Sequence, residues 1–159
     1  MSLDDWALAL HVLSAFALVA GIVFFWILIL AGRRVDTAAE VIRMGGPNKV
    51  AQICVGVGAA GTIVLGLWLA FSVGGYDIWD GWIVAALVLW VISMALGGRT
   101  SAVYSRAVAK ARELQRAGDS APNAELLALN RTTRGVLLQA LTSVAVLLVL
   151  LDMLFKPGA

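Results

Sequence analysis

The sequence predicts an all-α membrane protein in which four transmembrane helices form an up-down bundle. Hydrophobic residues make up 61% of the 159 residues and the mean hydropathy is +0.91, whereas soluble domains are roughly 45–50% apolar. Because a helix rises about 1.5 Å per residue, about 20 apolar residues match a hydrocarbon core about 30 Å thick. The chain contains four apolar runs, none with a charge in its middle, and the third is long enough only when its flanking residues are included. We expect a single domain (1–159) whose spans lie at about 6–31, 50–73, 79–98 and 134–154.

The distribution of basic residues predicts how these spans are oriented. Of the twelve Lys and Arg residues, four lie between spans one and two, seven lie between spans three and four, and only Lys156 lies on the other side. Lys and Arg concentrate in cytoplasmic loops, so we expect a multi-pass protein of a bacterial inner membrane with both termini extracytoplasmic (N-out, C-out). The first run is too long for a signal peptide and has no basic leader, so we expect it to remain as a span.

The segment between spans one and two predicts a short helix. Span one ends at Gly32-Arg33-Arg34, and Thr37 and Glu40 have the spacing of a capping box for a helix over 38–44. Gly45 and Gly46 close that helix in this interpretation, and Pro47 with Asn48 suits the start of span two.

Span two carries a face of small residues. Gly58, Thr62 and Gly66 recur every four residues and therefore lie on one side of a helix. Such a face lets another helix approach closely. The approaching helix belongs either to this chain or to a second subunit, and the sequence leaves both open.

Spans two and three are joined by a short connection over 74–81, which predicts a tight antiparallel hairpin. Four aromatic residues near the outer boundary match the aromatic belt that anchors membrane proteins at headgroup depth: Trp6, Tyr76, Trp79 and Trp82. Three deeper tryptophans are expected to pack between helices or contact lipid: Trp26, Trp68 and Trp90.

Residues 99–133 predict an extended cytoplasmic helical hairpin between helices three and four. Residues 99–116 contain no Pro and suit a helix that continues span three, whereas 117–123 is a turn cluster after which Ser120 would cap a returning helix. The basic face of this hairpin is expected to be solvated, to meet anionic headgroups or to dock a partner. Its residues are Arg106, Lys110, Arg112 and Arg116.

His11 is the only histidine and lies in the outer part of span one. It is expected near Asp152 and Met153 at the end of span four, where a contact with Asp152 would act as a pH-sensitive latch between the two helices. Hydrogen bonding to a neighbouring helix is the plainest role for it. The alternative is ligation of haem iron or copper, either with Met153 or, for bis-histidine haem, with a second chain.

Several function classes are disfavoured. A proton-coupled exporter of the small four-helix type needs a membrane-embedded carboxylate, and no Asp or Glu lies at mid-membrane depth. Cys54 is the only cysteine, which excludes paired-thiol chemistry. The net charge of +2 gives no reason to expect a nucleic-acid partner.

The residues Leu10-His11-Val12 followed by Ala20-Gly21, together with Asp80-Gly81-Trp82-Ile83, resemble an uncharacterised bacterial four-span family, domain of unknown function 2269. A more distant resemblance is to copper-resistance D proteins and to the protoporphyrinogen-oxidising membrane family, which share the histidine of the first helix. These resemblances imply a four-helix membrane fold and a haem- or copper-related role for His11 alone.

We therefore expect a non-enzymatic accessory, assembly or scaffold protein whose partners are the lipid bilayer and either a second copy or another membrane protein. The alternative is a haem- or metal-binding membrane protein using His11, with Met153 as second ligand and Asp152 as helper. A weaker alternative is a small-solute carrier that works as an oligomer. No residue is singled out as catalytic.

Overall fold

The computed structural model describes residues 2–72 and 76–156, and among these residues every regular element is a helix. The helices are α1 (Leu3–Gly32), α2 (Ala38–Arg43), α3 (Gly45–Ser72), α4 (Gly81–Arg116), α5 (Ala124–Asn130) and α6 (Thr133–Phe155). Four helical segments, containing α1, α3, α4 and α6, are long and apolar enough to cross a membrane, which confirms the all-helical, four-span part of the prediction.

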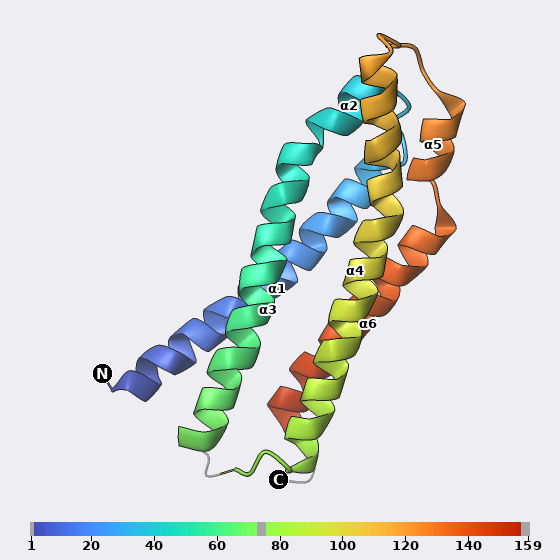
Figure 1. The fold of residues 1–159 in the computed structure, drawn as a ribbon. Coiled ribbons are helices and arrows are strands. Elements are labelled where there is room, and N and C mark those ends of the chain that lie inside the picture. Colours follow the sequence, from blue (N-terminus) through green and yellow to red (C-terminus); the bar gives the residue numbers. More distant parts are fainter. Residues whose placement is uncertain (1, 73–75, 157–159) are drawn as a thin grey trace.

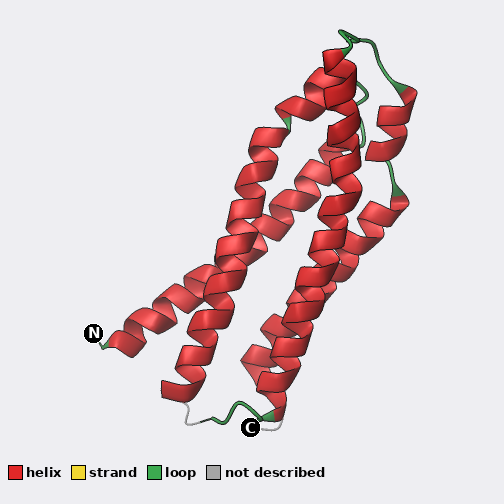
Figure 2. Ribbon diagram, viewed as in Figure 1, coloured by secondary structure: helices red, strands yellow, loops and turns green. Residues whose placement is uncertain are grey.

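The two described ends of the chain lie at the same end of the molecule (Figure 1). We call this the terminal end. At the opposite end, α2, the last turns of α4 and α5 lie together, and we call this the cap end; Figure 2 shows the loops that precede α2 and α5 there. Four long helices that alternate in direction between these ends give the expected up-down order.

The first three helices begin in different ways, and only α1 has a complete side-chain cap. Ser2 and Asp5 form a complete capping box, with Asp5 N–H donating to Ser2 Oγ over 3.1 Å and Ser2 N–H donating to Asp5 Oδ2 over 2.7 Å. α2 matches the short helix predicted over 38–44, but the predicted capping box does not form, because Thr37 Oγ1 donates to Glu40 Oε2 over 2.9 Å and neither side chain bonds a backbone N–H of the first turn. α3 begins at Gly45, earlier than predicted, because the first N–H groups of a helix need no partner and Pro47 is therefore tolerated there.

The four long helices are arranged as two pairs. α1 packs along α3, and α4 packs along α6, whereas contacts between the pairs are sparse. A small cluster of buried residues joins the pairs in the middle of the bundle: Leu18, Ile22, Ala59 and Val146. Two tryptophans add polar links, since Trp26 of α1 donates to Ser143 Oγ of α6 and Trp90 of α4 donates to the Ala59 carbonyl of α3.

The cap end has its own hydrophobic core, built from α2, α4 and α5. The buried residues are Ala38, Val41, Ala107, Ala111, Leu114 and Leu126. α4 continues unbroken from Gly81 to Arg116, as predicted. The returning helix differs from the prediction, because α5 begins at Ala124 and is capped by Asn123, whose Oδ1 accepts from Leu126 N–H over 3.0 Å, rather than by Ser120.

The predicted hairpin is therefore part of a three-helix unit, because α2 packs against α4 beside α5. Backbone and side-chain hydrogen bonds tie the two connecting segments together. Asn123 N–H donates to the Asp36 carbonyl over 2.8 Å, and Asn130 Nδ2 donates to the Val35 carbonyl over 3.0 Å. These bonds hold the segment after α1 against both ends of α5.

The outer surfaces of the long helices are apolar. Leu13 of α1, Val64 of α3 and Leu137 of α6 are among many large hydrophobic side chains that face outward. A soluble protein rarely exposes so large a continuous apolar surface. The surface is that expected of helices that contact lipid on one side and one another on the other.

Candidate functional site

A cavity of about 710 Å³ lies at the terminal end, between the two helix pairs. All four long helices contribute to its walls, which are mainly apolar. Both residues predicted as ligands of a cofactor, His11 of α1 and Met153 of α6, line it. Small-molecule sites in proteins are typically apolar cavities of roughly this size with a few polar groups, so this cavity is the candidate site.

The His11 ring is held against α3. A Cβ atom added to Gly66 would lie 2.9 Å from His11 Cε1 and 3.3 Å from His11 Nδ1, so the imidazole occupies the space that the glycine leaves. His11 Nδ1 is buried and has no hydrogen-bond partner among the described residues. This nitrogen lies on the side of the ring that packs against Gly66 and is closed to solvent.

Asp152 does not act as the predicted latch. Within residues 2–72 and 76–156 no ion pair joins it to His11, and its buried Oδ2 has no hydrogen-bond partner. Asp152 is not among the residues that line the cavity, whereas its neighbour Met153 is. Consecutive helical residues point about 100° apart, and on α6 the cavity is lined by Met153 and Leu154, on the side away from Asp152.

Three residues form a cluster of aromatic rings and one cation on the wall of the cavity. Tyr76 and Trp82 pack edge to face, with ring centroids 5.2 Å apart and planes at 83°. Lys156 Nζ lies 4.9 Å from the Tyr76 centroid and 5.4 Å from the Trp82 centroid. All three line the cavity, so a positive charge and two aromatic faces border its apolar interior.

Trp82 therefore departs from the predicted aromatic belt. Its side chain is only 8% exposed and its indole Nε1 has no partner in the described part of the chain, whereas Trp6 and Trp79 are 55% and 85% exposed. Trp82 lies in the first turn of α4, on the side that faces the other helices. Sequence position gave its depth in the bundle but not the direction of its side chain.

The start of α1 is fastened to the end of α3 by one carboxylate. Trp68 Nε1 and Ser72 Oγ both donate to Asp4 Oδ1, over 3.3 and 3.0 Å. Asp4 also lines the cavity. Trp68 thus contacts a polar group of α1 while most of the rest of its side chain remains exposed.

The face formed by Gly58, Thr62 and Gly66 lies against α1. A Cβ on Gly58 would collide with the backbone of α1, lying 2.8 Å from Leu18 Cα and 2.8 Å from the Ser14 carbonyl oxygen. Gly66 meets His11, as described above. In this structure the helix that approaches the small-residue face belongs to the same chain.

The four basic residues predicted for the hairpin have different surroundings. Lys110 Nζ pairs with Glu125 Oε2 of α5 at 3.1 Å and with Glu113 Oε1 at 3.3 Å. Its hydrogen bonds to Glu125 and then Glu113 raise the pKa of the Lys110 ammonium. Arg106, Arg112 and Arg116 are exposed, and the last two are one helical turn apart on α4.

The cavity offers few metal ligands. No group of three or more His, Cys, Asp and Glu side chains lies together in the described residues. His11 of α1 and Met153 of α6 both line the cavity, and a nitrogen–thioether pair is a donor set that haem iron and copper accept.

Comparisons of this chain with protein-family models, with curated proteins and with solved structures give no match. Lys156 and Tyr76 are the site residues that sequence reasoning missed. The signal for Lys156 was its isolation as the only basic residue at the terminal end.

Proposed function

We propose that this chain is a non-enzymatic accessory protein of a bacterial inner membrane, which acts by binding and positioning other components. In this proposal both termini are extracytoplasmic and the cap end lies in the cytoplasm. Every Lys and Arg residue except Lys156 belongs to the cap end or to the spans' boundaries with it. The positive-inside rule supports this orientation.

One observation carries the proposal: the cap end is packed before any partner arrives. Its six buried residues come from α2, α4 and α5, and hydrogen bonds fasten it to the segment after α1. Arg112 and Arg116 stand exposed on this fixed support. A preorganised charged surface loses little conformational entropy on binding, which suits an assembly or scaffold role.

Site-specific cross-linking in cells tests this role. A photoreactive amino acid at Arg116 should give discrete protein adducts, while the same group at outward-facing Leu137 should give lipid adducts. Arg112→Glu should abolish the Arg116 adducts, whereas Arg112→Lys should retain them because the charge is kept. The scaffold proposal fails if position 116 gives no protein adduct. It also fails if the yield of protein adducts does not change with the charge at position 112.

The orientation has its own test. In a Cys54→Ala background, single cysteines are placed at Ser2 and at Ser120, and intact cells are treated with a membrane-impermeant maleimide. We expect labelling at position 2 in intact cells and at position 120 only after permeabilisation. The reverse pattern would show that the cap end is extracytoplasmic.

A second candidate function is binding of haem or copper in the terminal cavity. His11 of α1 and Met153 of α6 line the same cavity. When bound, such a group would supply electron transfer, while His11 and Met153 would hold it and the apolar wall would exclude water. The family resemblance of the first helix agrees with this candidate.

Absorption spectra distinguish the two candidates. Protein purified in detergent after expression with excess haem should show a near-stoichiometric Soret band if the second candidate is correct, and His11→Ala should remove it. Met153→Leu should shift the band, whereas the control Met94→Leu, outside the cavity lining, should not. Absence of both a Soret band and bound copper would leave the accessory role alone.

The cavity reaches only the terminal end of the bundle. Its lining residues all lie within the terminal half of the long helices, at 4–19, 63–70, 76–87 and 150–156. The cavity therefore belongs to one side of the bundle and does not form a path between the two ends.

A further inference from the structure

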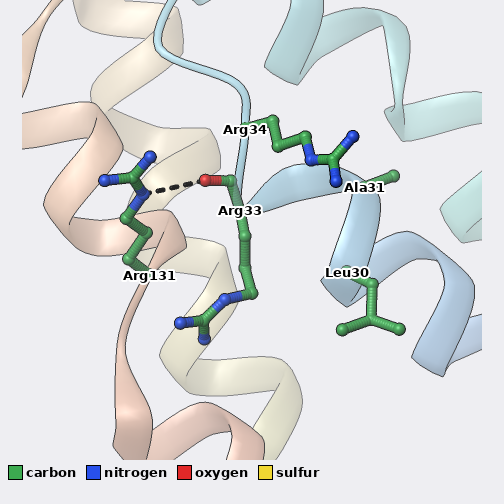
Figure 3. Close-up of a pocket in the computed structure, with 5 residues that line it drawn as sticks. All are labelled: Leu30, Ala31, Arg33, Arg34 and Arg131. Atoms are coloured by element: carbon green, nitrogen blue, oxygen red, sulfur yellow. Dashed lines mark hydrogen bonds between the residues drawn. The ribbon is translucent and has the colours of Figure 1, made fainter.

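A second hollow of about 710 Å³ lies at the cap end, where α1 finishes (Figure 3). Three of its five lining residues are arginines, Arg33 and Arg34 from the segment after α1 and Arg131 from the turn between α5 and α6. The other two, Leu30 and Ala31, belong to the last turn of α1. The hollow thus has a cationic part and an apolar part.

The Arg131 side chain is held in place by the backbone of α1. Its Nε donates to the Arg33 carbonyl over 2.9 Å, the bond drawn in Figure 3. This bond satisfies one of the carbonyls that a helix end leaves open. It uses only one of the five N–H groups of the guanidinium, so the terminal nitrogens of Arg131 remain available in a fixed position.

The three guanidinium groups form no ion pair with a carboxylate among the described residues. Among the described residues, Lys110 makes the ion pairs, and none involves Arg33, Arg34 or Arg131. The three side chains extend in different directions from the wall of the hollow (Figure 3), and together they make it positively charged with no described carboxylate to offset them, so an anion is attracted there. Guanidinium groups bind phosphate oxygens with paired N–H donors, which makes phosphate the preferred anion.

The apolar part of the hollow leads along the outside of α1. Leu30 is 58% exposed, and Ile27 and Val23, one and two turns earlier, are 56% and 53% exposed. Their spacing places them in one row on the helix surface. A molecule whose phosphate contacts the arginines would therefore have an apolar row of side chains beside it, pointing from the cap end toward the middle of the bundle.

We propose that this hollow binds the phosphate of an anionic phospholipid, with the acyl chains lying along Leu30, Ile27 and Val23. Arg131 supplies a preoriented donor group, and Arg33 and Arg34 supply the remaining charge. The site lies at the depth where a span ends and lipid headgroups begin. It does not depend on the accessory role of the exposed Arg112 and Arg116.

Lipid titration of the full-length protein, followed by native mass spectrometry, tests the site. The probes are phosphatidylglycerol, phosphatidylcholine and inorganic phosphate. Arg33→Gln with Arg34→Gln is the main variant, because Arg33 contributes its backbone carbonyl to the Arg131 bond and the bond survives the change. Arg112→Gln with Arg116→Gln is the matched control, since it removes the same charge from elsewhere on the cap end.

We expect the wild-type protein to prefer phosphatidylglycerol over phosphatidylcholine, and the main variant to lose about thirtyfold in affinity for it, from two charges near the lipid surface. The control should retain wild-type affinity. Equal losses in the two variants would show a general charge effect and overturn the proposal. Equal binding of both lipids would also overturn it, and displacement of lipid by inorganic phosphate would show that free phosphate is the ligand instead.

Discussion

Trp26 of α1 donates a hydrogen bond from its indole nitrogen to Ser143 Oγ of α6, over 2.9 Å and across 117 positions of the sequence. Ser143 in turn donates to the Gln139 carbonyl of its own helix. A similar bond runs from Trp90 Nε1 to the Ala59 carbonyl over 3.3 Å. Each joins one helix pair to the other, where few other contacts exist.

Replacing Trp26 by Phe should therefore weaken the association of the two pairs. We expect a loss of about 0.5–1.5 kcal/mol in the free energy of unfolding, the usual contribution of one hydrogen bond, plus some loss of packing. Ser143→Ala should cost a similar amount, and the double variant should cost less than the sum because both remove the same bond. Unfolding in mixed micelles measures this, and additive losses would contradict a direct interaction. Trp79→Phe is the control, because Trp79 is exposed.

Gly58→Ala should destabilise the α1–α3 pair. The new Cβ would lie 2.8 Å from Leu18 Cα, and backbone atoms can move away only if the helices separate. We expect a cost of about 1–3 kcal/mol, as for other overpacked sites. Gly56→Ala is the matched control, since a Cβ there meets nothing within 4 Å and Ala is the better helix former. A thermal unfolding temperature equal in both variants would refute the close approach.

Leu126→Ala should unfold the cap end without unfolding the bundle. Leu126 is fully buried in the cap core, and such truncations cost about 2–5 kcal/mol. Hydrogen exchange should accelerate at α5 and over 107–116 while exchange in α1 and α3 stays unchanged. Leu137→Ala, at an outward-facing position of α6, should leave exchange in the cap end unaltered. Uniform acceleration throughout the chain would mean that the cap is not a separate cooperative unit.

The Lys110 ion pairs predict a loss of cap-end order at alkaline pH. Glu125 and Glu113 raise the pKa of Lys110 in the folded chain above its ordinary value of 10.5. The stabilisation is therefore complete below pH 10.5 and is lost as the pH rises through the higher folded pKa.

The distance between spin labels on Arg112→Cys and Ala128→Cys, in a Cys54→Ala background, reports this change. We expect the distance distribution to broaden as the pH rises from 10.5 through the higher folded pKa of Lys110, since Lys110 then loses its charge. Adding Lys110→Met should make the distribution independent of pH over the same interval. Identical broadening in that variant would assign the effect to other groups.

Some features of the fold follow from local sequence alone. The apolar runs located α1, α3, α4 and α6 because the requirement for about 20 apolar residues is a matter of length and composition. The unbroken course of α4 through Gly97 and Gly98 was predicted from the absence of Pro. The position of α5 was less accessible, since Ser120 and Asn123 are both good caps and only packing against α2 and α4 decides between them.

The candidate sites depended more on tertiary contacts. His11 was noticed from its isolation in an apolar run, and Met153 from its place near the end of span four. His11 and Met153 line one cavity, whereas Asp152 does not. This difference results from how α1 and α6 are rotated about their axes. The arginine hollow was not predicted, because Arg131 lies 98 positions from Arg33 and only the fold brings them together.

The sequence by itself determined how many helices are long and apolar enough to cross a membrane, roughly where each begins and ends, and the uneven distribution of charge between the two ends. These properties depend on hydropathy and spacing along the chain, which solvent and lipid impose on each helix separately. The tertiary structure decided which helices pair, which side of Trp82 and His11 faces inward, and which arginines share a hollow. When a span is apolar on every side, its sequence does not indicate which side faces the other helices. In this chain the rotation of the helices is fixed by close contacts such as that of Gly58 with Leu18.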